Sequence, residues 1–410
     1  MAVAATIAEF NPFHNGHAWF LRELRARTDA EHIIVLMSGD FTQRGEPAII
    51  DRYARARMAL LGGADIVLEL PLVYACSSAE YYAAGAVAAL QHLGVVDALG
   101  FGAETADPVI LGEMAEMMSS AQAQEAYSEI LKENLRMGRS YAAARAEALV
   151  RTVDCDQEKA AACLRGSNNI LAMAYLTAMR QEGAKFDAVV MPRIGTAAHL
   201  DTGVPAQQNA DIASATAIRQ LLRLQTPEAA RPYLPEFCMP VLEDYLINRP
   251  MASWGDFDDV LFLRLLEEEE TVQYLDVTGD LSDAIRRNLQ KYHSAEALID
   301  TLRGRNRTEA SVRRALLHIL LRITGEEMAD CRRQGWPGAL RLLGFRREAQ
   351  TLLHRLRRHC TVPIIGALSE SRANMTEDPL FTQGIRAAML YDRLTGQDPH
   401  GRFEERPVVL

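Results

Sequence analysis

Two histidines three residues apart, His14 and His17, lie near the start of the chain, with Gly16 directly before the second. An apolar run over Val3–Ala8 precedes them, and a helix-compatible run follows from Ala18. A helix that begins here would offer unpaired N–H groups and the positive end of its dipole, and imidazoles can donate hydrogen bonds to phosphate oxygens. Glycine lets the backbone approach a ligand closely. The pattern therefore predicts a site for the phosphates of a nucleotide.

Two other interpretations of the histidines stay open at this point. A pattern of four residues can arise by chance on a surface loop, or it can be part of a metal site. The six cysteines are scattered and show no C-x-x-C spacing, so they indicate no metal cluster, and we predict no protein-bound metal. The flanking strand and helix favour phosphate chemistry, because a motif depends on its structural context.

Short apolar runs alternate with helical patterns through the first half of the chain. The expected strands are rich in Val, Ile and Leu, as is typical of buried parallel strands; they are Val3–Ala8, His32–Met37, Asp65–Leu70, Val95–Phe101 and Phe186–Met191. The helices expected between them are Ala18–Arg27, Ala54–Leu61 and Ala79–Leu93. This alternation predicts an α/β fold with a doubly wound parallel sheet, in which a ligand binds beyond the carboxyl ends of the strands.

A long segment, about residues 105–185, separates the fourth expected strand from the fifth. It is rich in Ala, Met and Glu and is expected to form a helical insertion. Within it, Asn168 and Asn169 follow Ser167 at an expected helix start. Ser167 or Asn168 can serve as the helix cap, or an asparagine amide can reach a nucleotide base or ribose.

A second candidate helix start follows the fifth strand. Ser214 is expected to cap this helix, and Thr216 and Arg219 fall in its first turns. One interpretation is a capped helix with a solvated arginine. We favour a second helix N-terminus directed at phosphate, with Arg219 supplying positive charge.

The second half of the chain shows helical patterns without convincing strands, after a proline-rich boundary near residue 227. Between Arg303 and Arg372 there are 15 arginines and six acidic residues, whereas the whole chain carries a net charge of −10. An even scatter of charge would be unremarkable, but an arginine-rich segment in an acidic protein favours RNA binding. We predict a catalytic domain over 1–225, an all-α, arginine-rich domain over 226–395, and a poorly packed tail over 396–410.

Composition and patterning limit the class of protein further. No apolar run approaches the roughly 20 residues of a membrane span, and the N-terminus has no basic segment followed by an apolar one. Scattered cysteines fit reduced thiols. We therefore expect a cytoplasmic protein with no membrane partner, and the oligomeric state stays open.

Several stretches together resemble one family. His14–His17 resembles the signature of the HxGH nucleotidyltransferase superfamily, and Ile212–Arg219 is similar to its second signature, with alanine in place of the first serine. The combination resembles the tRNA(Met) cytidine acetate ligase family. The stretches that carry this closer resemblance are Glu9–His17, Met37–Ala48, Glu69–Pro71, Ser167–Leu171, Arg193–Gly195 and Leu316–Leu321.

The resemblance implies a two-step activity. Members activate acetate with ATP, as acetyl-adenylate, and transfer the acetyl group to N4 of the wobble cytidine of elongator tRNA(Met). Mg²⁺ is expected to accompany ATP. By resemblance His14, His17 and Arg219 are catalytic, and the residues that contact ATP are Ile7, Ala8, Glu9, Phe10, Asn11, Pro12, Phe13, His14, Asn15, Gly16, His17, Gly102, Asn168, Asn169, Arg193, Ile194, Ser214 and Thr216.

Two alternatives to this activity remain. A small-molecule adenylyltransferase would use the same two signatures without needing the arginine-rich segment. A non-catalytic RNA-binding protein could retain the nucleotide pocket. Turnover of ATP with acetate and tRNA separates all three.

Overall fold

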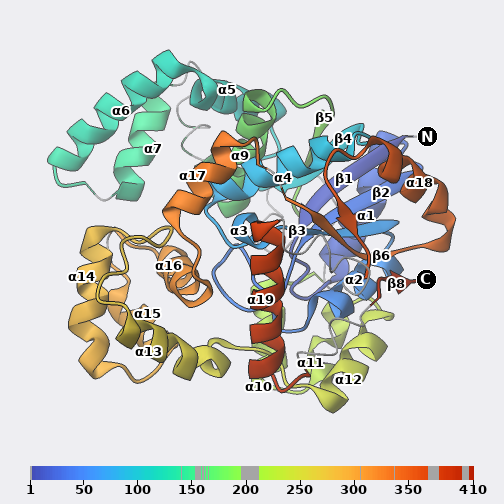
Figure 1. Ribbon diagram of the computed structural model, residues 1–410. Coiled ribbons are helices and arrows are strands. Elements are labelled where there is room, and N and C mark those ends of the chain that lie inside the picture. Colours follow the sequence, from blue (N-terminus) through green and yellow to red (C-terminus); the bar gives the residue numbers. More distant parts are fainter. Residues whose placement is uncertain are drawn as a thin grey trace.

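A mixed sheet runs through the middle of the computed structural model, with helices on both faces (Figure 1). The structure describes residues 2–139, 141–152, 158, 161, 163–164, 166–194, 212–304, 306–336, 338–367, 378–398 and 406–410. Within them the strand order is β5-β4-β1-β2-β3-β6-β7, and β8 also pairs with β6. The strands are β1 Val3–Ala8, β2 His32–Ser38, β3 Ile66–Leu70, β4 Ala98–Ala103, β5 Asp187–Pro192, β6 Leu340–Phe345, β7 Ile364–Ile365 and β8 Val408–Val409.

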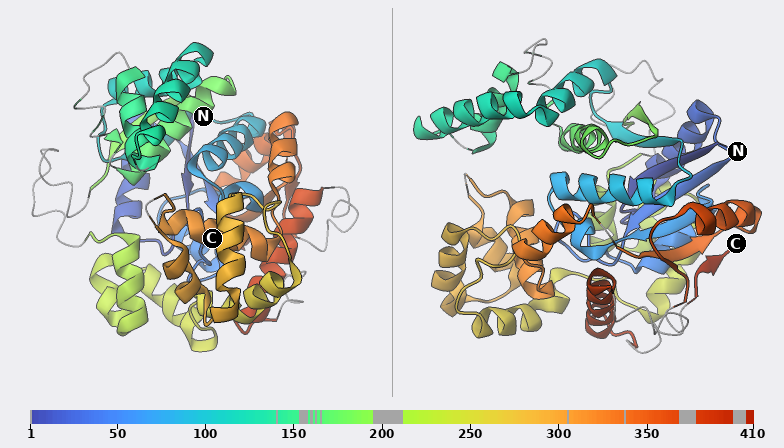
Figure 2. Two further views of the ribbon diagram at one scale, coloured as in Figure 1. Left: turned by 90° about the vertical axis from the view of Figure 1, so that its left-hand side faces the viewer. Right: turned by 45° about the horizontal axis from the view of Figure 1, so that its top comes forward.

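The helices of the first half connect and flank the parallel strands. They are α1 Asn15–Thr28, α2 Arg52–Leu61, α3 Leu72–Ala75, α4 Ala79–Leu93, α5 Pro108–Ser119, α6 Ala121–Arg136, α7 Tyr141–Thr152 and α9 Ser167–Gln181. The expected insertion is confirmed as helical, and α6 and α7 extend away from the sheet (Figure 2).

The second half is mainly helical and packs beside the sheet. Its helices are α10 Ala215–Leu224, α11 Pro227–Ala230, α12 Cys238–Asn248, α13 Asp258–Glu267, α14 Gly279–Asn288, α15 Ala295–Leu302, α16 Glu309–Leu321, α17 Gly325–Arg333, α18 Gln350–His359 and α19 Pro379–Leu394. Among the described residues, no helix combines the length and the apolar character that a bilayer span requires.

All five expected strands are present and mutually parallel, which confirms the doubly wound α/β prediction. Strand β2 is buried along its whole length, as its unbroken apolar run predicts. The first helix begins at Asn15 rather than Ala18, because the side chain of His14 caps it. The helix expected from Ala54 begins at Arg52, with Asp51 as its cap.

The prediction of an all-α second half is wrong. Strand β6 pairs antiparallel with β3, β7 and β8 pair with β6, and the three extend the sheet at one edge. The apolar pattern of β6 is interrupted by Arg341, which is nonetheless buried and lies 5.4 Å from the centroid of the Tyr53 ring. At the described end of the expected tail, residues 406–410, β8 belongs to the sheet. A domain boundary near residue 225 stays a prediction.

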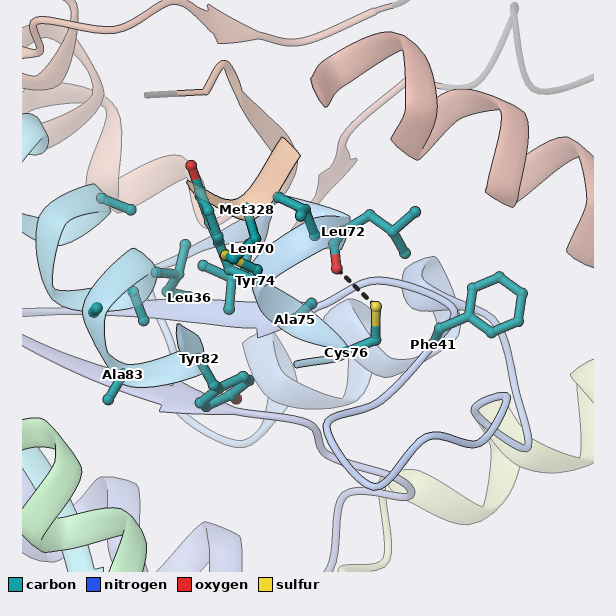
Figure 3. Close-up of a cluster of buried hydrophobic side chains, with 14 of the residues drawn as sticks. Leu36, Phe41, Leu70, Leu72, Tyr74, Ala75, Cys76, Tyr82, Ala83 and Met328 are labelled. Carbon is teal, nitrogen blue, oxygen red and sulfur yellow. Dashed lines mark hydrogen bonds between the residues drawn. The ribbon is translucent and has the colours of Figure 1, made fainter. Parts of the chain in front are cut away.

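One hydrophobic core joins the sheet to helices from both halves of the chain. Figure 3 shows Leu36 of β2 and Leu70 of β3 in the same cluster as Tyr74 of α3 and Met328 of α17. His318 of α16 is fully buried, and its Nε2 lies 3.0 Å from the carbonyl oxygen of Cys76. The helical part is therefore held directly against the strand ends.

Candidate functional site

His14 and His17 form a stacked pair at the N-terminus of α1. The N–H of Gly16 donates to His14 Nδ1 over 3.1 Å, and the N–H of His14 donates to His17 Nδ1 over 3.3 Å. The ring centroids are 3.6 Å apart with an interplanar angle of 21°. Because each Nδ1 accepts a hydrogen bond, each neutral ring carries its proton on Nε2. The motif thus holds two N–H donors side by side.

Both histidines are neutral near pH 7. Burial lowers the pKa of His14 to about 3, and the positive charge of Arg193 adds to the effect. Burial, His14 and Arg193 hold the pKa of His17 well below its usual value. In the free protein the pair therefore offers hydrogen bonds rather than full positive charge.

The residues before the histidines mainly fix the shape of the loop. Phe13 is fully buried, and the space it fills exists because Gly62 has no side chain. Asn11 Oδ1 accepts from the N–H of Ile49 over 2.9 Å, and the Asn11–Pro12 peptide is cis. Phe10 packs edge-on against the His17 ring, with centroids 4.8 Å apart. Their expected contacts with ATP, like those of Ile7, Ala8 and Asn15, stay predictions.

The second signature lies against the first, as expected. Arg219 is only 7% exposed, and its Nη1 donates to the carbonyl oxygen of Asn11 over 3.0 Å. Its Nη2 donates to Thr216 Oγ1 over 3.3 Å and forms an ion pair with Glu46 at 2.9 Å. Ser214 caps α10 through a 3.2 Å hydrogen bond from the N–H of Ala217. The expected cap is confirmed, and the alternative in which Arg219 is solvated, which we did not favour, is wrong.

The start of α10 and the start of α1 also lie close together. A Cβ atom added to Gly16 would be 3.6 Å from Ile212 Cγ2. The carboxyl end of β1 therefore lies near two helix N-termini, an arrangement that favours anions.

Arg193 brings a further positive charge to the histidine side of the site. It is half-buried, and its Cγ would lie 3.2 Å from a Cβ added to Gly102 of β4. Gly102 thus leaves room for Arg193 to cross the strand. Ile194 is the last described residue of this segment, and 195–211 lie outside the described residues.

A carboxylate from β4's loop caps the helix that carries the two asparagines. Glu104 accepts from the N–H groups of Asn168 and Asn169 over 3.2 and 2.8 Å. Burial alone would raise the pKa of Glu104, but these hydrogen bonds outweigh burial and hold that pKa below its usual value. The alternative in which Ser167 or Asn168 caps the helix is wrong, because Gly166 occupies the cap position. Glu104 was recognisable in the sequence only as a residue near a strand end.

The two asparagines differ in their surroundings. Asn169 is buried, and its Oδ1 accepts from the N–H of Thr105 over 2.9 Å. Asn168 is half-buried, and its Nδ2 donates to Glu104 over 2.5 Å. Asn169 therefore fixes the β4–α9 junction, whereas Asn168 is the amide that a ligand can reach.

Arg55 is a site-shaping residue that the sequence did not reveal. It is completely buried, and it donates to the carbonyl oxygens of Glu9 (2.7 Å), Ser38 (3.0 Å), Ile50 (3.1 Å) and Gly39. One guanidinium therefore ties the end of β1 to the end of β2. The sequence could have indicated this role of Arg55 only through its position on the buried face of α2, which an apolar residue would ordinarily occupy.

The loop after β2 is braced by the second half of the chain. Gly45 has φ of +77°, and a Cβ there would lie 2.4 Å from the backbone nitrogen of Arg314 in α16. Trp254 Nε1 donates to the carbonyl oxygen of Gly45 over 3.1 Å. The helical part thus positions the loop that supplies Glu46 to Arg219.

The arginines of the second half fall into two groups. Those of 303–333 are largely ion-paired, including Arg313 with Glu296 (2.7 Å) and Arg314 with Asp276 (3.1 Å). In α18, Arg357 and Arg358 are exposed and have no ion pair among the described residues. Because Phe345 pairs with Ile66, α18 follows β6 at the edge where the parallel strands begin (Figure 1). Arg357 and Arg358 therefore lie at the opposite edge of the sheet from His14 and His17.

The chain matches the HIGH Nucleotidyl Transferase family over residues 1–405. It is 32% identical over 393 residues to the tRNA(Met) cytidine acetate ligase of Thermoanaerobacter sp. (strain X514), with 95% of each chain covered. It is 34% identical over 413 residues to the ligase of the same name from Bacillus velezensis, with 99% and 95% covered. The crystal structure of Thermotoga maritima TmcAL bound with alpha-thio ATP superposes with a TM-score of 0.90 at 28% identity over the whole of both chains.

Proposed function

The chain belongs to the tRNA(Met) cytidine acetate ligase family, and from this premise we propose that it joins acetate to tRNA(Met) at the expense of ATP. The observation that carries the proposal is the meeting of the two signatures: Arg219 bonds to the loop that presents His14 and His17. The small-molecule adenylyltransferase is not favoured, because the ligase relatives cover nearly the whole chain.

In the first step the acetate carboxylate attacks the α-phosphorus of ATP, and pyrophosphate departs. Negative charge grows on the phosphoryl oxygens during this displacement. The Nε2–H groups of His14 and His17 donate to those oxygens, and the N-terminus of α1 favours the same charge. Since both rings are held by backbone N–H groups, the donors need no rearrangement at the moment of reaction.

The far end of the triphosphate lies toward α10 in this proposal. Arg219 supplies a buried positive charge there, and Ser214 and Thr216 stand at the helix start. Mg²⁺ would be held by the triphosphate oxygens, and the N–H groups of His14 and His17 and the guanidinium of Arg219 would hold phosphate oxygens rather than the cation. Gly102, Asn168, Arg193 and Ile194 border the nucleoside side.

In the second step N4 of the wobble cytidine attacks the acetyl-adenylate, giving N4-acetylcytidine and AMP. The base must leave the anticodon stack to reach the adenylate, as single-stranded bases can. We propose that arginines of the second half hold the tRNA through its phosphates, and that the reaction takes place in the cytoplasm, where tRNA is used.

The activation step can be tested without tRNA. Exchange of labelled pyrophosphate into ATP should require acetate, because the label returns only through acetyl-adenylate. A rate of pyrophosphate exchange that does not depend on acetate, and instead depends on a phosphorylated metabolite, would contradict the proposal and support an adenylyltransferase.

A further inference from the structure

At the carboxyl edge of the sheet, several of the described acidic side chains are engaged by arginines or by backbone N–H groups. Glu69 lies 2.5 Å from Arg52, Glu46 lies 2.9 Å from Arg219, and Asp51 lies 2.5 Å from Arg249. Asp40 accepts from the N–H of Arg52 over 3.0 Å, and Glu104 caps α9. These carboxylates position backbone and arginines. Glu9 forms no ion pair with a described arginine within 4.0 Å and accepts one backbone hydrogen bond.

Glu9 follows β1 directly. Its backbone carbonyl and one of its two carboxylate oxygens accept hydrogen bonds from the protein. Its carbonyl oxygen accepts from Arg55 Nη1 over 2.7 Å, and its Oε1 accepts from the N–H of Gln43 over 2.8 Å. No described residue donates to Oε2 within hydrogen-bonding distance. The side chain is half-buried, so this second oxygen remains available at the strand end where the two signatures meet.

The surroundings of Glu9 make it a better base than an exposed carboxylate. Burial raises the pKa of Glu9, against the opposing influence of Arg44, the Gln43 N–H and Arg219. A raised pKa brings a carboxyl group closer to the neutral range in which general bases work best. The charged and titratable groups that face Glu9 from the neighbouring elements are Arg44 and Glu46 of the loop after β2, Arg219 of α10, Arg55 of α2, Tyr82 of α4 and Tyr175 of α9.

The histidines are poorly suited to take a proton. Each Nδ1 already accepts a backbone hydrogen bond, so each neutral ring holds its proton on Nε2. A second proton would have to form an imidazolium, which burial strongly disfavours in both rings. The pair is built to donate, and the acyl-transfer step needs a separate acceptor.

We propose that Glu9 is the catalytic base of acyl transfer, with Oε2 accepting a proton from the cytidine amine. The inference rests on the proposed function. As the bond from N4 to the acetyl carbon forms, the bond from that carbon to the AMP oxygen breaks, and its electron pair leaves on AMP. The proton lost from N4 goes to the carboxylate of Glu9. A carboxylate also accepts hydrogen bonds from the cytosine N4 amino group, so Glu9 orients the base that it activates.

The test separates the two half-reactions in the full chain. In Glu9→Gln the amide oxygen can still accept from the Gln43 N–H, so the loop is retained, but the side chain cannot take a proton. Single-turnover transfer from preformed acetyl-adenylate to tRNA should fall about 10²–10⁴-fold further than acetate-dependent pyrophosphate exchange does. The decline of the wild-type transfer rate toward acid pH, where Glu9 becomes protonated, should disappear.

A matched control is Glu23→Gln on α1, which removes a partly exposed carboxylate that pairs with Arg27 and should leave both half-reactions unchanged. The inference is overturned if Glu9→Gln transfers acetyl at the wild-type rate with the same acid limb, or if exchange falls as far as transfer. If the wild-type protein itself fails to acetylate tRNA, the proposed function fails as well, so the two failures are distinguishable.

Discussion

Arg219 donates a hydrogen bond to the carbonyl oxygen of Asn11 and so joins the second signature to the loop of the first across 208 residues. The same guanidinium pairs with Glu46 from the loop after β2. The Arg219 side chain therefore links three segments of the site: α10, the loop after β1 and the loop after β2. Its planar fork allows this, because it presents several N–H donors at fixed angles.

Arg219→Lys should keep the positive charge and lose this fork. We expect acetate-dependent pyrophosphate exchange to fall by about 10–10²-fold, because a 1 Å misplacement of reacting groups can cost about 10²-fold. The control is Arg223→Lys, an exposed arginine one turn further along α10. Exchange at the wild-type rate in Arg219→Lys would show that only charge is needed.

His14→Asn should separate the cap from the donor. Asparagine is a good N-cap, so it can accept from the Gly16 N–H in place of Nδ1, but it does not place an N–H where Nε2–H points. We expect exchange to fall by about 10² or more, as when an oxyanion donor is removed, with the melting temperature nearly unchanged. Full activity would mean that His14 serves only as a cap.

The buried His14 should also make stability depend on pH. Its pKa is lowered from 6.5 to about 3 on folding, so below about pH 6.5 the unfolded chain binds a proton that the folded chain does not. Above about pH 6.5 the neutral His14 therefore does not lower the free energy of unfolding. As the pH falls below this value, the free energy of unfolding decreases, because only the unfolded chain binds the proton. Between pH 7 and pH 5 this amounts to about 2 kcal/mol. Denaturant unfolding should be measured at pH 7 and at pH 5. Between them the free energy of unfolding should fall by about 2 kcal/mol less in His14→Asn than in wild type. An equal fall in both proteins would contradict the lowered pKa of His14.

Gly45→Ala should disturb the loop after β2 by a steric contact. Its φ of +77° and the approach of the α16 backbone both exclude a side chain. Gly138 is a matched control, because its φ is +76° but nothing lies within 4 Å of an added Cβ. Both alanines carry a strain of about 1 kcal/mol or more, and the unfolding free energy of Gly45→Ala should fall by about 1–3 kcal/mol beyond its control. An equal decrease in the unfolding free energy of Gly45→Ala and Gly138→Ala would contradict a steric contact between position 45 and the α16 backbone.

Arg357 and Arg358 should contribute to tRNA binding if α18 faces the RNA. Replacing both with glutamine should weaken binding and reduce the slope of log K against log salt by about one to two. The control replaces Arg332 and Arg333 with glutamine, since these pair with Glu80 and Asp330. Pyrophosphate exchange should be unaffected in both variants. An unchanged slope for the α18 variant would place the tRNA on another surface.

The sequence predicted the five parallel strands well because each is rich in Val, Ile, Leu or Ala and is followed by polar residues. It missed β6, in which Arg341 is the second residue, and only the fold shows that the Tyr53 ring accommodates this arginine. It placed the start of α1 three residues late because histidine is not an expected cap. The roles of Arg55 and Glu104 depend on backbone groups that tertiary structure brings near, so no local pattern could have indicated them.

Transfer of label from acetate to tRNA is the most direct measurement of the central claim. The protein, ATP and labelled acetate should be incubated with elongator tRNA(Met), and with the same tRNA carrying uridine in place of the wobble cytidine. We expect label in the first tRNA only, recovered as N4-acetylcytidine after nuclease digestion, together with one AMP per acetyl group. Absence of label, or equal label in the uridine-containing tRNA, would contradict the assignment of this site to acetate ligation.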